Sequence, residues 1–354
     1  MEHLPALGTA IRDIVQPTIK LYEPHLLKNA DDIRSVRRSI FSYGPHERQQ
    51  LDVYRPYEAR ISQHGRRPVL LFLYGGGLTM GHKTLPGVAD ELCHANVASF
   101  FALRYGYDVV IPDYRLVGTH DAKFPSGGED VCLAVRWILE KTGTFGPEPV
   151  DLFIMGNSAG GVHLSTFLLH ENYAATRRSI LRYNPHVQLR GIVFLSVPFH
   201  FRLAHASRAE VNKAYYGDEV DAHSPLGLLR KRQAGGEIDF IKSGARTLVL
   251  NGDLDPEDEI LIPRDDFIKQ WHATGSKLAR QSLAVDFMHG HNHISPWVSL
   301  GTAARKDVTV DFMHEYAQIS PWASPGAATD PEEAWGHQVA AFCNNVRIFE
   351  PPEW

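Results

Sequence analysis

The stretch of sequence that decides the fold is residues 150–169, VDLFIMGNSAGGVHLSTFLL. Its apolar run up to Met155 leads into Gly156-Asn157-Ser158-Ala159-Gly160, and a helical pattern follows to Leu169. A strand that ends in Gly-x-Ser-x-Gly and continues into a helix is a nucleophile elbow, in which the serine occupies a strained corner with positive φ. Small flanking residues avoid collisions with the neighbouring strand and the following helix. We therefore predict that Ser158 projects as a nucleophile from the end of a buried strand.

Apolar runs and helical patterns alternate on both sides of this stretch. This alternation predicts an α/β protein with a mostly parallel central sheet and helices on both faces. The run before Tyr74 is continuously apolar, as expected for a strand that is covered on both sides. The earliest strand, 49–54, is predicted to lie at the edge of the sheet. The other predicted strands are 68–74, 108–112, 150–155, 191–196, 247–250 and 283–287, and the predicted helices are 88–105, 129–141, 159–169 and 332–349.

The segment 198–243 is too long for a simple connection between two elements of a sheet. We interpret it as a cap inserted into a core that consists of residues 46–197 and 244–354. Residues 1–45 are predicted to form an N-terminal arm, which is a second candidate component of the cap. Aromatic residues of the cap predict an apolar pocket or a cap core, and our hypothesis is that Tyr215 or Tyr216 lines the pocket.

The bulk properties exclude several functional classes. A net charge of −5 over 354 residues argues against general nucleic-acid binding. Three cysteines lie far apart and give neither a disulfide framework nor a metal-binding spacing, which favours a reducing compartment. The first residues lack a secretory signature, and no apolar stretch reaches the ~18 to 20 residues that span a bilayer. We therefore expect a cytoplasmic protein that binds no nucleic acid and no membrane.

One internal repeat stands near the C-terminus. Asp286-Phe287-Met288-His289 followed by Ile294-Ser295-Pro296-Trp297 recurs in residues 311–322. Two copies do not make a solenoid, so a local tandem duplication is the simpler interpretation. His291 and His293 correspond to Tyr316 and Gln318 in the second copy. If one copy supplies a catalytic histidine, it is therefore the first.

A serine hydroxyl needs a base to remove its proton and an acid to orient that base. With a serine on such an elbow, the chain order is serine, carboxylate, histidine. The carboxylate is expected after the strand 247–250, where several acids follow one another. We favour Asp255, because Pro256 fixes the turn and directs the preceding side chain, with Asp253 next and Asp258 third. Glu257 and Glu259 are interpreted as parts of a solvated turn.

The histidine is expected after the last strand, where three histidines stand at alternate positions. We prefer His293 as the base over His291 and His289. Such a cluster can suggest a metal site, but no carboxylate or cysteine lies at metal-ligand spacing. We therefore predict neither a metal ion nor a cofactor.

A tetrahedral intermediate places negative charge on an oxygen that fixed N–H groups must stabilise. Gly75-Gly76-Gly77 follows the strand 68–74, where such donors belong, and the Gly76 and Gly77 amides together with that of Ala159 are predicted to form the oxyanion hole. A phosphate-binding loop is the rival interpretation. It requires a Lys-Ser/Thr pair that does not follow these glycines.

Together these motifs resemble the α/β-hydrolase superfamily, and within it the hormone-sensitive-lipase-like esterases and the kynurenine-formamidase-like group. The resemblance extends from about Leu51 to Phe349 and is weakest over the cap. Tyr74 stands where this group usually has a histidine, and Glu257 stands where an apolar residue is usual. The residues that carry the resemblance are Tyr74–Gly77, Asp113–Leu116, Phe124-Pro125, Asp130, Trp137, Ser158, Ser224-Pro225, Asp255-Pro256 and His293.

The resemblance implies a serine hydrolase that cleaves a carboxylic ester, or a related acyl bond, of a small apolar or aromatic molecule through an acyl-serine. In these roles Ser158 attacks, His293 transfers the proton and Asp255 orients the imidazole. It also implies that Asp113, Arg115 and Asp130 are structural. Arylformamide hydrolysis of the kynurenine formamidase type and lactone-forming or lactone-opening acyl transfer are the alternatives within the same chemistry. A non-catalytic ligand receptor of the same fold is the alternative from another class, and a homodimer is compatible with the sequence.

Overall fold

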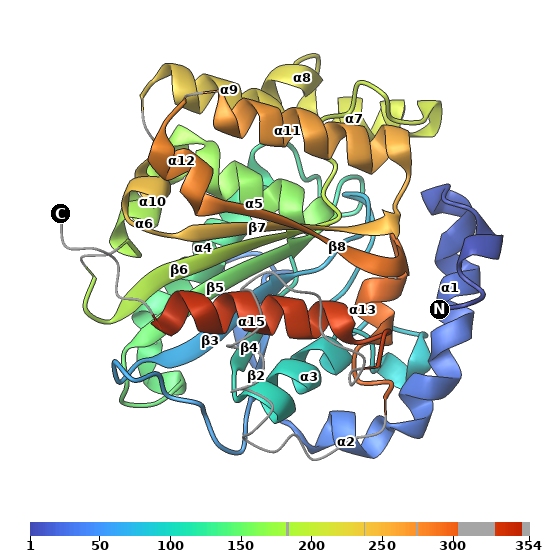
Figure 1. Ribbon diagram of the computed structural model, residues 1–354, viewed down its shortest axis with the longest axis vertical. Helices are drawn as coiled ribbons and strands as arrows, with labels where there is room; N and C mark the ends of the chain where they lie inside the picture. The colour runs from blue at the N-terminus through green and yellow to red at the C-terminus, as the bar shows by residue number, and fades with distance from the viewer. Residues whose placement is uncertain (182–183, 237, 274, 304–329, 349–354) are drawn as a thin grey trace.

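The computed structural model describes residues 1–181, 184–236, 238–273, 275–303 and 330–348. Its centre is an eight-stranded sheet in the order β1-β2-β4-β3-β5-β6-β7-β8 (Figure 1). The strands are β1 Arg37–Ser42, β2 Gln50–Arg55, β3 Arg67–Leu73, β4 Asp108–Pro112, β5 Val150–Asn157, β6 Val187–Leu195, β7 Arg246–Leu254 and β8 Leu283–Asn292.

The six strands from β4 to β8 along this order are parallel to one another, which confirms the predicted mostly parallel sheet. The prediction of an edge position for the earliest strand was wrong. β2 pairs antiparallel with both β1 and β4, so β1, inside the segment predicted as an arm, is the edge. β1 was not predicted from the sequence because it begins with two arginines and is largely exposed. Edge strands that avoid aggregation often have these features.

The buried strands present alternate side chains to two hydrophobic layers, because successive residues of a strand point to opposite faces. In β3, Val69, Leu71 and Leu73 belong to the layer beneath α5 (Ala159–Leu169) and α11 (Ile262–His272). Leu70 and Phe72 belong to the layer over α3 (Ala95–Tyr105) and α15 (Ala334–Ile348). Figure 1 shows these helices on the two sides of the sheet, as predicted.

The helix expected over 88–105 begins only at Ala95, because the preceding residues include a left-handed turn at His94. The helix predicted at 129–141 begins earlier, at Ser126. The second copy of the repeat, 311–322, lies outside the described residues. The remaining helices are α1 Ile11–Lys28, α2 Ala30–Ser35, α4 Ser126–Glu140, α6 Ala174–Ser179, α7 Ala209–Tyr216, α8 Val220–His223, α9 Pro225–Ala234, α10 Asp239–Lys242, α12 Lys277–Ser282 and α13 Ser295–Ser299.

The segment predicted as the cap lies between β6 and β7 and contains α7, α8, α9 and α10. α9 packs against α5 and α11, at the top of the view in Figure 1. The N-terminal helix α1 packs instead against α13, next to the end of β8. None of the helices in the described ranges is both long and apolar enough to cross a bilayer.

Candidate active site

Ser158 stands at the corner between β5 and α5, with φ 48° and ψ −119°. Its N–H donates to the Leu195 carbonyl of β6 at 2.9 Å, which fixes the corner against the neighbouring strand. The corner is tight enough to require glycines around it. A Cβ on Gly160 would stand 2.1 Å from the Leu73 carbonyl oxygen, and one on Gly156 would stand 2.6 Å from the Gly161 Cα. This local crowding explains why only small residues flank the serine.

His293 reaches Ser158 from the end of β8, the strand at one edge of the sheet. His293 directly follows β8, and its Nε2 lies 3.0 Å from the Ser158 Oγ. The other ring nitrogen, Nδ1, lies 2.9 Å from the Oδ1 of Asp255, which stands in the turn after β7. Because the carboxyl ends of parallel strands meet at one edge, residues separated by more than a hundred positions converge there. The arrangement is a hydroxyl, an imidazole and a carboxylate in one hydrogen-bonded chain.

The Asp255 carboxylate is held from every side. Its Oδ2 accepts hydrogen bonds from the Ser196 Oγ at 2.6 Å and from the Gly252 N–H at 2.9 Å, while Oδ1 faces the imidazole. Asp255 is 3% exposed and His293 is 3% exposed. A buried charge is tolerated only when hydrogen bonds replace its hydration, which these donors do. The carboxylate therefore fixes the orientation of the imidazole.

The competing acids and histidines lie elsewhere. Asp253 is exposed, and its Oδ1 accepts the Gly290 N–H at 2.8 Å. His289 is exposed and lies 3.6 Å from the Asp253 Oδ2. His291 is buried with its Nδ1 2.9 Å from the Ser295 Oγ, and burial lowers its pKa to about 3. Asp258 points to solvent.

The loop that carries His293 is fastened by its own neighbours and by the N-terminal helix. The Asn292 Oδ1 accepts the N–H groups of Ile294 and Ser295, both at 2.9 Å. The Asn292 Nδ2 donates to the Thr18 Oγ1 of α1 at 2.9 Å. All of these polar groups are buried, so the loop cannot exchange them freely for water. The imidazole is therefore held by a rigid support.

The predicted oxyanion donors lie beside the serine. Gly77 and Ala159 line the same cavity as Ser158, and Gly76 and Gly77 have φ values of 148° and 59°. A Cβ on Gly76 would stand 2.0 Å from the Met80 carbonyl oxygen, so only glycine fits there. Among the hydrogen bonds of the described residues, none uses the N–H of Gly76 or Gly77 as its donor. Ala159 is the first residue of α5, where N–H groups have no partner within the helix.

Tyr74, which stands where a histidine is usual in the group that the sequence resembles, supports this glycine loop. Its hydroxyl donates to the Asp113 Oδ1 at 2.6 Å and accepts from Arg48 at 3.0 Å. Its ring stacks between His94 and Tyr114, and the Tyr114 hydroxyl donates to the Tyr74 carbonyl at 2.8 Å. The phenol is fully buried. These buried contacts of Tyr74 therefore hold the start of the glycine loop in place. They do not use the N–H groups of Gly76 or Gly77.

Asp130 and Arg115 form a second polar network, at the start of α4. The Asp130 carboxylate accepts the side chain and the backbone N–H of Arg115 at 2.9 and 2.8 Å, and the Gln49 amide at 2.7 Å. These contacts join the start of α4 to the segment after β4. They hold the backbone in place and do not reach the serine's cavity.

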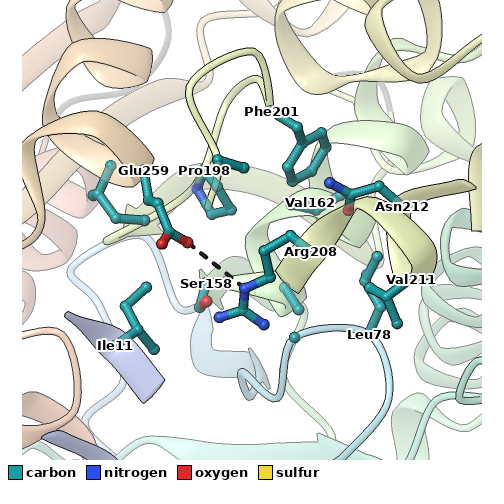
Figure 2. A pocket seen from close by; sticks show the side chains of 14 residues that line it. Ile11, Leu78, Ser158, Val162, Pro198, Phe201, Arg208, Val211, Asn212 and Glu259 are labelled. Carbon is teal, nitrogen blue, oxygen red and sulfur yellow. Dashed lines mark ion pairs between the residues drawn. The ribbon is translucent and has the colours of Figure 1, made fainter. Parts of the chain in front are cut away.

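The cavity next to Ser158 has a volume of about 40 Å³ (Figure 2). Its walls are mostly apolar and come from five segments that are distant in sequence: the start of α1, the loop after β3, the corner between β5 and α5, the segment after β6 and the turn after β7. Arg208, Asn212 and Glu259 are the polar side chains on its wall in addition to Ser158. The apolar wall residues are Ile11, Leu78, Val162, Pro198, Phe201, Ala204, Val211 and Ile260.

Two interpretations of this region were wrong. Tyr215 and Tyr216 do not line the cavity. They are buried in the hydrophobic layer around α5, where the Tyr215 hydroxyl accepts the Gly127 N–H at 3.0 Å. Glu259 is not simply solvated, because it lies on the cavity wall with its Oε2 3.6 Å from the Arg208 Nε. A short π-helical turn, Glu257–Leu261, directs it inward.

Other residues around the serine had no signal in their own sequence context. Ser196, which donates to Asp255, directly follows β6, so its position at the end of a neighbouring strand was its only indication. Ile11 and Arg208 reach the cavity from segments without a recognisable motif. Among the described residues, no group of three or more His, Cys, Asp or Glu side chains is arranged to hold a metal ion.

Solved structures of other proteins share this architecture. An esterase from Pyrobaculum calidifontis matches 98% of this chain and 95% of its own, with a TM-score of 0.55 and 18% identity. Carboxyl esterase 2 from Tuber melanosporum matches 76% of this chain and 82% of its own, with a TM-score of 0.53 and 18% identity. The chain has the α/β-hydrolase fold. At this level of identity the matches show the fold alone.

Sequence comparisons find a family model and more distant relatives over parts of the chain. The BD-FAE family model matches residues 51–213, which include the glycine loop and the elbow. Liver carboxylesterase 1 of Oryctolagus cuniculus is 32% identical over 120 residues, and neuroligin-2 of Mus musculus is 24% identical over 220 residues. These matches cover 34% and 60% of this chain, and 20% and 25% of the relatives. The chain thus spans about a fifth to a quarter of the length of these curated relatives.

Proposed function

We propose that this α/β-hydrolase cleaves carboxylic esters through a covalent acyl-serine. The observation that carries the proposal is the unbroken chain of hydrogen bonds from the Ser158 Oγ through His293 to Asp255, with the serine open to a cavity. A similarity over 120 residues to liver carboxylesterase 1 of Oryctolagus cuniculus supports it. A relay of this kind converts a weak alcohol into a nucleophile at neutral pH.

The proposed reaction begins when the Ser158 Oγ attacks the ester carbonyl carbon and its proton passes to the His293 Nε2. Asp255 stabilises the resulting imidazolium and stays ionised. The carbonyl oxygen becomes an oxyanion that accepts hydrogen bonds from the N–H groups of Gly76, Gly77 and Ala159. The imidazolium then protonates the departing alcohol. A water molecule, deprotonated by His293, attacks the acyl-serine and releases the acid and the free serine.

The size of the cavity indicates a short acyl or alcohol group. A water molecule needs roughly 10–15 Å³ of cavity volume, so a cavity of about 40 Å³ has room for a group of a few heavy atoms. The wall around it is largely apolar. We therefore propose esters with short chains as the substrates, in line with the apolar substrate expected from the sequence.

The proposal is tested with 4-nitrophenyl acetate and butyrate and with a fluorophosphonate that labels activated serines. The wild-type protein should hydrolyse the esters and gain the mass of the phosphonyl group on Ser158. Ser158→Ala should do neither, whereas Ser165→Ala, a buried serine on α5, should do both. One of the solved structures, esterase 2 from Thermogutta terrifontis, is described as phosphonylated by sarin, so this chemistry suits the fold. Absence of both turnover and adduct in the wild type would favour the non-catalytic receptor.

The same preparation separates the alternatives within the proposed chemistry. N-formylkynurenine, aromatic esters and lactones are compared with the short aliphatic esters at equal concentration. A specificity constant for N-formylkynurenine far above that of every ester would identify an arylformamide hydrolase. Preferential opening or closing of a lactone would identify the acyl-transfer alternative.

A further inference from the structure

A cationic side chain occupies the cavity beside the serine, although the proposed hydrolysis of a neutral ester does not require one. Arg208 immediately precedes α7, and with Val211 and Asn212 it forms the face of that helix start that lines the cavity. Positions i, i+3 and i+4 lie on one face of a helix, so the three side chains point together. Figure 2 shows the guanidinium end of Arg208 projecting into the cavity, with its ion pair to Glu259 drawn.

The guanidinium lies directly over the glycine loop. Its Nη1 is 2.7 Å from the place that a Cβ on Gly77 would occupy, so the missing side chain of Gly77 makes room for it. Gly77 and Ser158 line the same cavity. A group bound to Arg208 would therefore lie next to the proposed oxyanion hole and beside the reacting carbonyl.

The two outer nitrogens of this guanidinium have no acceptor among the described residues. The Arg208 contact with Glu259 joins Nε to Oε2 at 3.6 Å, which is too long for a hydrogen bond, and no hydrogen bond within the described ranges uses Nη1 or Nη2. The side chain is 33% exposed, so water reaches it. Two parallel N–H groups in a planar fork match the two oxygens of a carboxylate.

We propose that Arg208 binds a carboxylate of the substrate, so that the preferred substrates are short esters that also carry a free carboxylate near the scissile bond. This inference rests on the proposed esterase function and specifies its substrate class. The apolar walls of the cavity contact the rest of such a molecule, and the fork of Arg208 fixes its charged end. Binding at two ends places the ester carbonyl against Ser158 in one orientation.

Glu259 acts in this proposal as the internal counter-ion of the empty site. It is 19% exposed and stands on the cavity wall opposite the free edge of the fork. When the carboxylate arrives, Glu259 is a like charge close to it and opposes its binding. Neutralising Glu259 should therefore favour charged substrates, whereas removing Arg208 should disfavour them. A purely structural ion pair would behave differently, because losing either partner would then damage the site in the same way.

The experiment uses two matched pairs of esters that differ only in a carboxylate. Monomethyl succinate and dimethyl succinate carry it on the acyl side, while 4-acetoxybenzoate and methyl 4-acetoxybenzoate carry it on the alcohol side. The measured quantity is the ratio of kcat/KM for the charged member to that for the neutral member. Each compound is also measured as a competitive inhibitor of 4-nitrophenyl acetate hydrolysis, so that a compound that binds without turning over still gives a result.

In at least one pair we expect Arg208→Gln to lower the charged-to-neutral ratio by about 30-fold or more, because a charge-assisted bidentate contact is lost. Arg208→Lys should restore part of the ratio, since a lysine keeps the charge without the fork. Glu259→Gln should raise it by ~3-fold or more. The pair that responds identifies the side of the ester bond that carries the carboxylate.

The inference is overturned if Arg208→Gln lowers both members of each pair equally, because Arg208 would then act on the reaction or on the fold. It is also overturned if Arg208→Gln and Glu259→Gln change the ratio in the same direction. Neither outcome affects the proposed function, which stands as long as the neutral esters or 4-nitrophenyl acetate are hydrolysed by the wild type and not by Ser158→Ala.

Discussion

The two sides of Ser158 are built in different ways. On one side His293 and Asp255 are almost fully buried, and the buried Ser196 and Asn292 hold the relay in place through hydrogen bonds of 2.6 to 2.9 Å. On the other side the cavity wall consists mostly of apolar side chains, and its charged members are the partly exposed pair of Arg208 and Glu259. The relay side comes from the ends of sheet strands, and the cavity side comes largely from the arm and the segment after β6.

This difference separates the parts that would do chemistry from the parts that would choose the substrate. A proton relay tolerates little misplacement, so it is built on rigid strand ends whose backbone is fixed by the sheet. An apolar wall needs shape rather than a particular hydrogen bond, so it can be assembled from helices that change without disturbing the sheet. We therefore expect substitutions on the relay side to act on kcat and substitutions on the cavity side to act on KM.

The largest expected effect in this comparison is that of Asp255→Asn. The amide cannot stabilise the imidazolium and favours the wrong tautomer of His293, so kcat for 4-nitrophenyl acetate should fall by about 10⁴-fold. The matched control is Asp253→Asn, whose carboxylate contacts Gly290 at the surface and not the imidazole, and it should change kcat by less than about threefold. Steady-state kinetics at saturating ester check both values. An equal loss in the two variants would contradict the choice of Asp255.

A smaller effect is expected at the cavity wall from Ile11→Ala. Deleting these methyl groups removes part of the apolar wall that the N-terminal arm supplies. If the substrate loses about one methylene-sized contact, binding weakens by about 1.4 kcal/mol, so KM for 4-nitrophenyl butyrate should rise by roughly tenfold. The effect on kcat should be much smaller.

Asp13→Ala serves as the control for this variant, because Asp13 is exposed on the same helix and does not line the cavity. A fall in kcat without a change in KM for Ile11→Ala would show that the arm supports the relay rather than the substrate. The hydrogen bond between Asn292 and Thr18 of α1 is the contact through which the arm would support the relay in that case.

The smallest effect is expected in the pH dependence of stability, and it concerns a histidine on the helix that follows Ser158. His163 on α5 is buried between Tyr114 and Tyr215, and burial lowers its pKa to about 3. Below pH 6.5 the unfolded chain therefore binds a proton that the folded chain does not, and the free energy of unfolding decreases as the pH falls. One such group contributes a slope of at most about 1.4 kcal/mol per pH unit.

Denaturant unfolding of His163→Gln between pH 4 and 6 should show a shallower pH dependence than the wild type, by about 1 kcal/mol per pH unit. Phe167→Leu, a buried substitution on the same helix, should lower stability and keep the wild-type slope. If both variants keep that slope, His163 remains neutral in the unfolded chain or is protonated in the folded one. His163 would then make no contribution to the pH dependence of stability.

Much of the fold was predictable because its signals are local. The continuous apolar runs of β3 and β5 and the Gly-x-Ser-x-Gly elbow are imposed by burial on both faces and by crowding at one corner, which act on neighbouring residues. β1 was missed because an edge strand that is largely exposed has no such constraint. The same reason applies to Arg208 and Ile11, which lie in segments whose place over the serine depends on packing.

The sequence by itself determined that a serine stands at a strained strand end, that a glycine loop lies near it, and that an acid and a histidine follow in the order the fold requires. Only the tertiary structure decided which of several acids and histidines meet, since that depends on where β7 and β8 end in space. It also decided that Glu259 faces inward opposite Arg208 and that Tyr215 and Tyr216, in the segment predicted as a cap, do not reach the cavity. Local sequence patterns indicate the local backbone conformation, because it depends on neighbouring residues. Contacts between distant segments depend on how the whole chain packs.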